Sequence, residues 1–108
     1  MGLLERSAAE QYASWFRALA DPSRVQLVAL LAERDEAMSV GQIVAAMGLA
    51  QSTVSQHLKI LAEVRFVLVE SVGNARHYRI NANCVAAFPS AADLVMGKPA
   101  PITAGGCS

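Results

Sequence analysis

Apolar side chains recur at helical spacing in the first part of the chain. Residues 5–20 place them at positions i, i+3, i+4 and i+7, which predicts an amphipathic helix. Its apolar face is largely aromatic and is formed by Tyr12, Trp15, Phe16 and Leu19. We expect this face to serve the core or a dimer contact rather than a ligand site.

A second helix is predicted directly after the first. Asp21 has a residue type that favours an N-cap, and Pro22 suits the first helical position because its missing N–H would have no partner there. We expect the apolar residues of this helix to be buried, namely Leu27, Val28 and Leu31. Residues 34–37 (RDEA) are predicted to form a short solvated loop after it.

The stretch from residue 39 to residue 64 predicts two more helices joined by a tight turn. Ser39 and Gln42 have the spacing of a capping box, and Gly48 suits the left-handed residue that ends a helix. The next helix is predicted over Gln51–Glu63. Two helices connected this closely indicate a helix-turn-helix.

The helix predicted at 51–63 combines an apolar stripe with a polar outer surface. The stripe consists of Val54, Leu58 and Leu61. Short hydrogen-bonding side chains and one cation, the types that meet base edges and phosphates in a major groove, form the outer surface: Gln51, Ser52, Thr53, Ser55, Gln56 and Lys59. The alternative is an ordinary amphipathic helix pair with a solvated surface.

A β-hairpin is predicted next. Residues 66–72 are rich in β-branched and apolar side chains, a Gly-Asn turn follows, and residues 75–81 return as a second strand. The order helix, helix, hairpin predicts a mainly α fold with a β-hairpin wing (α+β), the winged helix-turn-helix. The alternative for the hairpin alone is a plain solvated element with ordinary surface cations.

Cations gather in the proposed DNA-reading unit. Arg76 and His77 stand beside the hairpin turn, with Arg79 further along, where they can reach a DNA backbone. The whole chain has 9 Lys and Arg and 9 Asp and Glu residues, so its formal charge is zero. Residues 50–80 nevertheless carry four Lys and Arg against two acids, whereas residues 1–49 carry four Arg against six acids. We therefore expect DNA affinity to depend strongly on salt and on hydrogen bonds.

The chain resembles the ArsR/SmtB family of bacterial metal- and stress-responsive repressors. Three segments carry the resemblance, in the family's order and spacing: LADPSRVQLVALL (19–31), STVSQHLKIL (52–61) and RHYRIN (76–81). The resemblance implies a homodimer that binds double-stranded operator DNA and lets go when an effector binds. It also implies base and phosphate contacts from Gln51, Ser52, Thr53, Ser55, Gln56, His57 and Lys59.

One residue departs from the family pattern. The family usually has Gly after the recognition helix, and this sequence has Arg65 there. A residue other than Gly in the left-handed conformation costs about 1 kcal/mol or more. Either the turn differs in this chain or the strain is accepted.

Length and composition predict one small domain. With 108 residues there is room for one core, and an apolar fraction of 54% suggests that some apolar surface is buried against a partner. We expect the domain to span residues 1–97, with a final helix over Asn83–Met96 that breaks near Pro89, and residues 98–108 to form a flexible tail. No signal peptide or membrane-spanning stretch is evident, so the expected compartment is the cytoplasm.

The cysteines are the candidate effector ligands. Residues 39–44, where the family often has a cysteine motif, contain no Cys, and Asp93 stands alone on the predicted last helix. Cys84 and Cys107 remain, and two thiolates suit a soft metal ion or an organoarsenical, within one chain or across a dimer. The alternatives are a buried apolar Cys84 with an incidental tail thiol, or a redox disulfide switch. No cofactor is expected to be required.

Two other functional classes compete with a repressor. The sequence contains no paired carboxylates with a supporting base, no phosphate-binding Gly loop and no zinc-type CxxC, so we expect no enzyme. Two alternatives remain: a winged helix used only for protein contact, and a regulator that responds to no metal.

Overall fold

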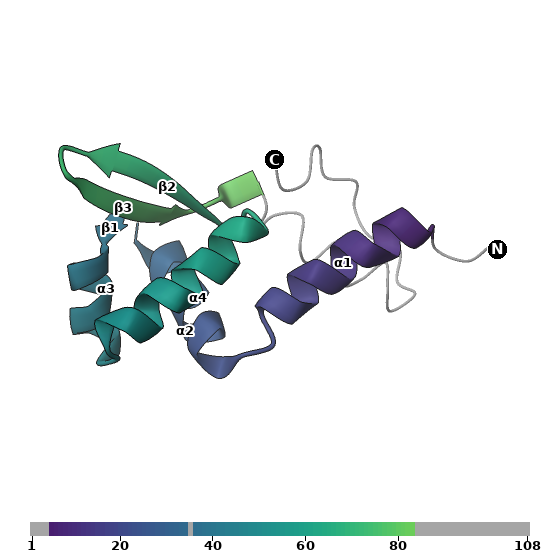
Figure 1. Cartoon of the computed structure of the whole chain (residues 1–108), viewed down its shortest axis with the longest axis horizontal. Coiled ribbons are helices and arrows are strands. Elements are labelled where there is room, and N and C mark those ends of the chain that lie inside the picture. The colour runs from purple at the N-terminus through teal and green to yellow at the C-terminus, as the bar shows by residue number, and fades with distance from the viewer. Residues whose placement is uncertain (1–4, 35, 84–108) are drawn as a thin grey trace.

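The computed structural model describes residues 5–34 and 36–83 (Figure 1). In chain order the elements are α1 (Arg6–Ala18), α2 (Pro22–Glu33), β1 (Met38–Ser39), α3 (Val40–Met47), α4 (Gln51–Glu63), β2 (Val67–Val72) and β3 (Ala75–Ile80). The predicted fold class is confirmed, since helices α3 and α4 form the helix-turn-helix and β2 and β3 form the wing. α4 was predicted with its observed bounds, whereas α1 is shorter than the predicted 5–20.

Local sequence signals set the helix ends. The Asp21 carboxylate accepts hydrogen bonds from the backbone N–H groups of Ser23 at 2.8 Å and Arg24 at 3.3 Å, which caps α2. Both hydrogen bonds of the capping box between Ser39 and Gln42 are present at the start of α3. Gly48 ends α3 in the left-handed conformation, with φ 70°. These three predictions are confirmed.

The sheet has one strand more than the predicted hairpin. Its strand order is β1-β3-β2, and both pairings are antiparallel. Met38 and Ser39 of β1 lie opposite Tyr78 and His77 of β3. The predicted loop at 34–37 therefore leads directly into a strand. A strand of two residues is too short to produce an alternating pattern, so only its pairing with β3 identifies it.

The core forms where α2, α3 and α4 meet the base of the wing. The stripe Val54, Leu58 and Leu61 is fully buried, as predicted, and packs with Leu27, Leu31, Ile43 and Phe66. Val28 is half-buried and packs against this core, so its predicted burial is confirmed only in part. α1 projects away from the other elements (Figure 1), and its Trp15 ring lies 6.4 Å from the Phe66 ring, centroid to centroid.

Arg65 connects α4 to the wing in a strained conformation. Its φ is 67°, so the left-handed turn is kept without glycine. The buried Asn81 side chain donates a hydrogen bond to the Arg65 carbonyl at 2.8 Å, and the Asn81 backbone N–H donates to the Phe66 carbonyl at 2.9 Å. These two bonds join the end of the wing to the end of α4 and hold the strained turn in place.

Several predictions lie outside the described residues. Residues 82 and 83 are helical, but the rest of the final helix predicted over Asn83–Met96 is not described, nor is the predicted tail. Cys84 and Cys107 are also outside the described part of the chain. None of the helices at 5–34 and 36–83 combines the length and apolar character needed to span a bilayer.

Candidate nucleic-acid interface

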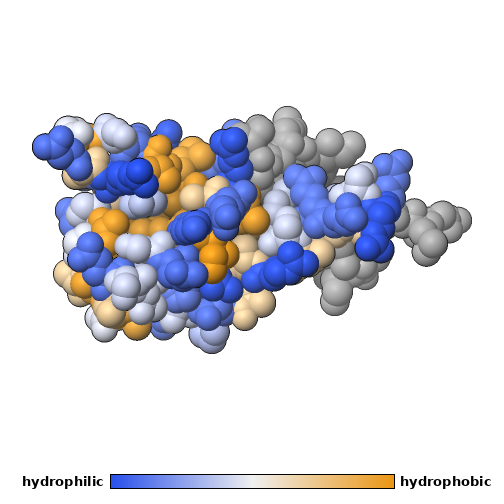
Figure 2. All heavy atoms as spheres, in the orientation of Figure 1, coloured by the Kyte–Doolittle hydropathy of each residue, from blue (hydrophilic) through white to orange (hydrophobic). Residues whose placement is uncertain are grey.

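The outer surface of α4 is the first component of the site. All six side chains predicted to form it are exposed: Gln51, Ser52, Thr53, Ser55, Gln56 and Lys59. They are exposed because the opposite side of the helix is held in the core by Leu58 and its neighbours in the buried stripe. Figure 2 shows mainly hydrophilic surface over α4 and apolar surface between α4 and the hairpin. The helix therefore presents hydrogen-bonding groups without burying them against its own chain.

The two ends of α4 differ in charge. At the N-terminal end the N-cap residue is Ala50, which makes no side-chain hydrogen bond to the first turn. The first N–H groups of a helix have no intrahelical partner and attract anions such as phosphate. At the other end, the exposed Glu63 carries a negative charge that phosphates avoid. A DNA backbone is therefore accommodated better at the N-terminal half of α4 than at its C-terminal end.

A groove of about 770 Å³ separates α4 from the wing. Ser55 and Lys59 line it from α4, and Val69 and Arg76 line it from the hairpin. The strand register explains the position of Arg76, which pairs with Ser71 and thus lies on the same sheet face as the buried Val67. One cation from the helix and one from the wing consequently border the same groove.

The other wing cations lie on the opposite face of the hairpin. His77 and Arg79 alternate with Arg76 and Tyr78 along β3, so they point away from α4. The Arg79 guanidinium forms an ion pair with the Glu70 carboxylate at 3.5 Å, and both side chains are about half-exposed. The structure thus brings Arg76 together with Lys59, but it does not bring His77 or Arg79 to that groove.

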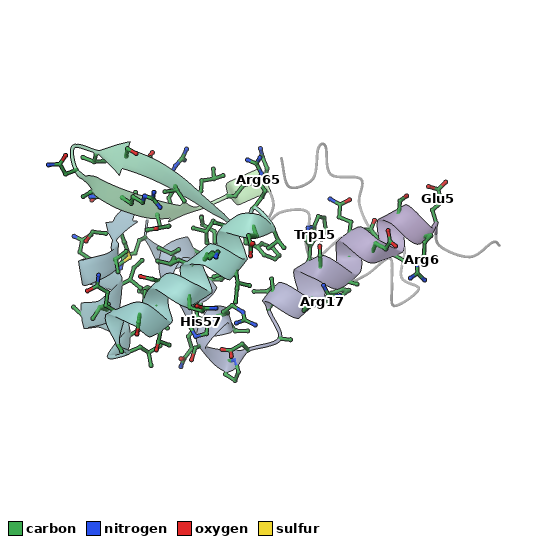
Figure 3. The ribbon with its side chains drawn as sticks, in the orientation of Figure 1. Glu5, Arg6, Trp15, Arg17, His57 and Arg65 are labelled. Carbon is green, nitrogen blue, oxygen red and sulfur yellow. The ribbon has the colours of Figure 1, made fainter. Side chains whose placement is uncertain are left out.

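His57 occupies a different environment from the other polar residues of α4. It is half-buried on the side of the helix that faces α2 (Figure 3), and its Nδ1 lies 3.3 Å from Nη1 of Arg24. The Nε of Arg24 donates a second hydrogen bond to the Ala18 carbonyl at 2.5 Å. His57, predicted to contact DNA, therefore has a hydrogen-bond partner within its own chain.

The Asp21 carboxylate belongs to the same junction between α1 and α2. Partial burial raises the pKa of Asp21, but hydrogen bonds from the backbone N–H groups of Arg24 and Ser23 lower it, as do the positive charge of Arg24 and, to a smaller degree, His57. The net result is a pKa below the usual value for aspartate. The helix cap is accordingly charged at neutral pH, and its contribution to stability is lost only in acid, as the pH falls through that lowered pKa.

Two side-chain contacts, made by Arg24 and Asn81, were not predicted from the sequence. Arg24 contacts a residue 33 positions away, and Asn81 contacts one 16 positions away. Helical periodicity relates residues only a few positions apart, so it predicts neither contact. The sequence offered one indication for Asn81, namely that a polar residue stands at the end of a predicted strand.

The described residues offer no metal centre. Within residues 5–34 and 36–83, no group of three or more His, Cys, Asp or Glu side chains is arranged to hold a metal ion. The candidate thiolates of Cys84 and Cys107 fall outside these ranges.

Comparison with known sequences identifies related regulators. The family model described as bacterial regulatory protein, arsR family, matches residues 21–68. A transcriptional repressor SmtB homolog of Synechocystis sp. is 40% identical over 77 residues, which cover 71% of this chain and 57% of that protein. The HTH-type transcriptional regulator Rv0081 of Mycobacterium tuberculosis is 36% identical over 87 residues, which cover 80% of this chain and 75% of that protein.

Solved structures share the fold. The crystal structure of Rv0081 from M. tuberculosis superposes with a TM-score of 0.67 at 33% identity, covering 87% of this chain and 92% of that chain. The solution structure of the homodimeric winged helix-turn-helix DNA-binding domain of Mb0332 from Mycobacterium bovis gives a TM-score of 0.68 at 30% identity, with 90% of both chains covered. The fold and the relatives are those of DNA-binding transcriptional regulators and not of enzymes.

Proposed function

Because this chain belongs to the ArsR family of bacterial transcriptional regulators, we propose that it is a repressor that reads a DNA operator with α4 and the wing. One observation carries the proposal: the polar outer surface of α4 is exposed and adjoins a groove bordered by Lys59 and Arg76. Amide and hydroxyl side chains suit base edges, and the two cations suit the phosphates beside them.

The proposed contacts divide into two kinds. Gln56, Ser55, Ser52 and Thr53 read base edges, while the N-terminal end of α4 with Gln51 approaches a phosphate. Lys59 and Arg76 contact phosphates from the two sides of the groove. His77, on the far face of the hairpin, serves a neighbouring phosphate.

We also propose that the repressor is a homodimer. Support comes from α1, which projects from the other elements and carries aromatic residues, and from the homodimeric M. bovis domain. A dimer doubles the local surplus of positive charge and presents two copies of α4 to two half-sites. Sedimentation velocity measures the oligomeric state directly. A protein that is monomeric both free and bound to DNA would contradict the proposed homodimer.

An effector that releases the operator is the third part of the proposal. Cys84 and Cys107 are its candidate ligands, and the expected effector is a thiophilic metal ion or a trivalent organoarsenical. Cys84→Ser and Cys107→Ser should each leave DNA binding intact and abolish release by methylarsenite or mercury. Release that persists in the double variant would remove both thiols from the mechanism and favour a regulator that needs no metal.

A salt titration tests the DNA-binding proposal itself. Binding to the duplex upstream of the gene should weaken steeply as salt rises, because phosphate contacts release counterions. A binding constant that ignores salt, or no binding at low salt, would favour a winged helix used for protein contact.

A further inference from the structure

One guanidinium links three parts of the fold. Arg24, in the first turn of α2, donates from Nε to the carbonyl of Ala18 at the end of α1 and lies 3.3 Å from His57 on α4. The contact with His57 is a hydrogen bond between a side chain of α2 and a side chain of α4. Arg24 is thus placed to transmit the position of α1 to the helix proposed to read DNA.

The contact requires a neutral imidazole. A guanidinium can only donate hydrogen bonds, so Nδ1 of His57 must accept and the ring proton must sit on Nε2. A protonated imidazole carries N–H groups on both nitrogens and a positive charge. Protonation would therefore remove the acceptor and leave two cations side by side.

The charged groups around this contact come from every packed element. Asp21, in the α1–α2 turn, carries a negative charge close to both Arg24 and His57. Arg17 from α1 and Glu63 from α4 line a hollow of about 360 Å³ together with Arg24. Asp21 attracts a protonated His57, but Arg24 lies at hydrogen-bond distance and repels it.

We propose that Arg24 is a positioning residue that holds α4 against the end of α1 through a hydrogen bond to neutral His57. Protonation of His57 breaks this bond and loosens α4, which weakens operator binding. The inference rests on the proposed function, because it assumes that α4 reads the operator. It also changes the role of His57 from a DNA contact to an internal acceptor.

The sign of the pH dependence separates these two roles. Histidine commonly changes charge between about pH 5 and pH 8. A His57 that contacted a phosphate would bind DNA more tightly in acid, because it would gain a positive charge. A His57 that accepts from Arg24 would make binding weaker in acid, because it would lose its acceptor.

The experiment measures affinity by fluorescence anisotropy at pH 8 and pH 6, using a duplex that the protein selects from a random pool. All proteins carry His77→Asn, so that the half-buried wing histidine does not contribute to the pH dependence. We expect the affinity of this parent to fall several-fold from pH 8 to pH 6, because the acceptor is lost in the molecules whose His57 is protonated. Tighter binding at pH 6, or no change, would overturn the proposal.

Variants of the two partners complete the test. His57→Leu and Arg24→Gln should each bind about tenfold more weakly at pH 8 and show little further change at pH 6. His57→Asn should restore binding at pH 8, because its Oδ1 can accept in place of Nδ1, and should remove the pH dependence. If His57→Asn bound as weakly as His57→Leu, the hydrogen bond would not be the cause.

Arg17→Gln is the matched control, because it removes the same charge from the same hollow without touching His57. It should leave both the affinity and its pH dependence within about twofold of the parent. Arg24→Gln should also leave the salt slope unchanged, whereas loss of a phosphate contact would lower the slope by about 1. A lowered slope would make Arg24 a phosphate ligand instead.

The free protein provides a readout independent of DNA. Nitrogen-15 NMR of the His57 ring should show the Nε2–H tautomer in the parent and a mixture of tautomers in Arg24→Gln. A parent that shows the Nδ1–H tautomer would overturn the hydrogen bond. Failure of the parent to bind any duplex at low salt would instead overturn the proposed function.

Discussion

The two flanks of α4 differ in what they meet. On the wing side, Ser55 and Lys59 border an open groove with Arg76 across it. On the α2 side, His57 is half-buried and bonded to Arg24, which also bonds to the end of α1. Both flanks carry polar residues of the kind found in DNA-reading helices. One flank keeps them available for a partner, and the other connects the helix to its own scaffold.

This difference shows that residue type alone does not assign a role on a recognition helix. His57 and Gln56 are neighbours in sequence and both suit DNA contacts chemically, yet only Gln56 is exposed. The buried stripe decides which side faces inward, and the packing of α2 decides which of the remaining sides is covered. Substitutions on each side of α4 test this difference.

The largest effect is expected from a substitution in the buried stripe of α4, which holds both flanks of the helix in place. Leu58 is fully buried between them, and Leu58→Ala should lower the free energy of unfolding by about 2–5 kcal/mol. Chemical denaturation followed by the fluorescence of Trp15, the single tryptophan, measures this loss. The exposed Ala45 provides a control, since Ala45→Ser should change stability by about 0.5 kcal/mol or less. Equal effects would mean that the stripe does not anchor α4.

The next effect concerns sequence reading. Gln56→Ala should weaken binding to the selected operator about 10- to 100-fold, because a lost base contact costs about 1–3 kcal/mol. Binding to a random-sequence duplex should change little, since that binding depends mainly on phosphates. Competition binding with the two duplexes measures the ratio. Equal losses on both DNAs would move the reading surface away from this side of α4.

A smaller effect is expected on the wing. Arg76→Ala should weaken binding to operator and random duplex alike by several-fold and reduce the salt slope by about 1. Arg79→Ala is the matched control, because it removes the same charge from the hairpin but Arg79 is paired with Glu70. A larger loss from Arg79→Ala would reverse the assignment of the two faces.

The smallest effect is expected on stability, from a substitution in the turn between α4 and the wing. Arg65→Gly should raise the free energy of unfolding by about 0.5–1 kcal/mol, because glycine adopts the observed φ of 67° without strain. The corresponding rise in melting temperature is about 2–8 °C for a domain of this size. Gly41→Ala, in the first turn of α3, is a comparison variant at a glycine that is not in the left-handed conformation. The added Cβ would lie 3.9 Å from the Ser39 hydroxyl, an ordinary contact distance. A destabilised Arg65→Gly would show that the Arg65 side chain contributes more than its strained backbone costs.

Much of the fold was predictable because its signals are local. The cap at Asp21, the capping box at Ser39, the left-handed Gly48 and the stripe of α4 all involve residues within a few positions of each other. The hairpin likewise follows from a turn dipeptide between two β-rich runs. The exposure of the predicted base-reading residues on α4 followed from the same stripe.

The rest required contacts between residues far apart in sequence. β1 exists only because Met38 and Ser39 pair with β3, and the strained turn at Arg65 is held by Asn81. Helical and strand periodicity assign a residue to a side of its own element, but they do not say which element covers that side. Local sequence signals are therefore sufficient to predict a helix-turn-helix with a wing and its exposed polar surface. The position of His57 against Arg24 follows from the packing of α2 beside α4, which no local signal describes.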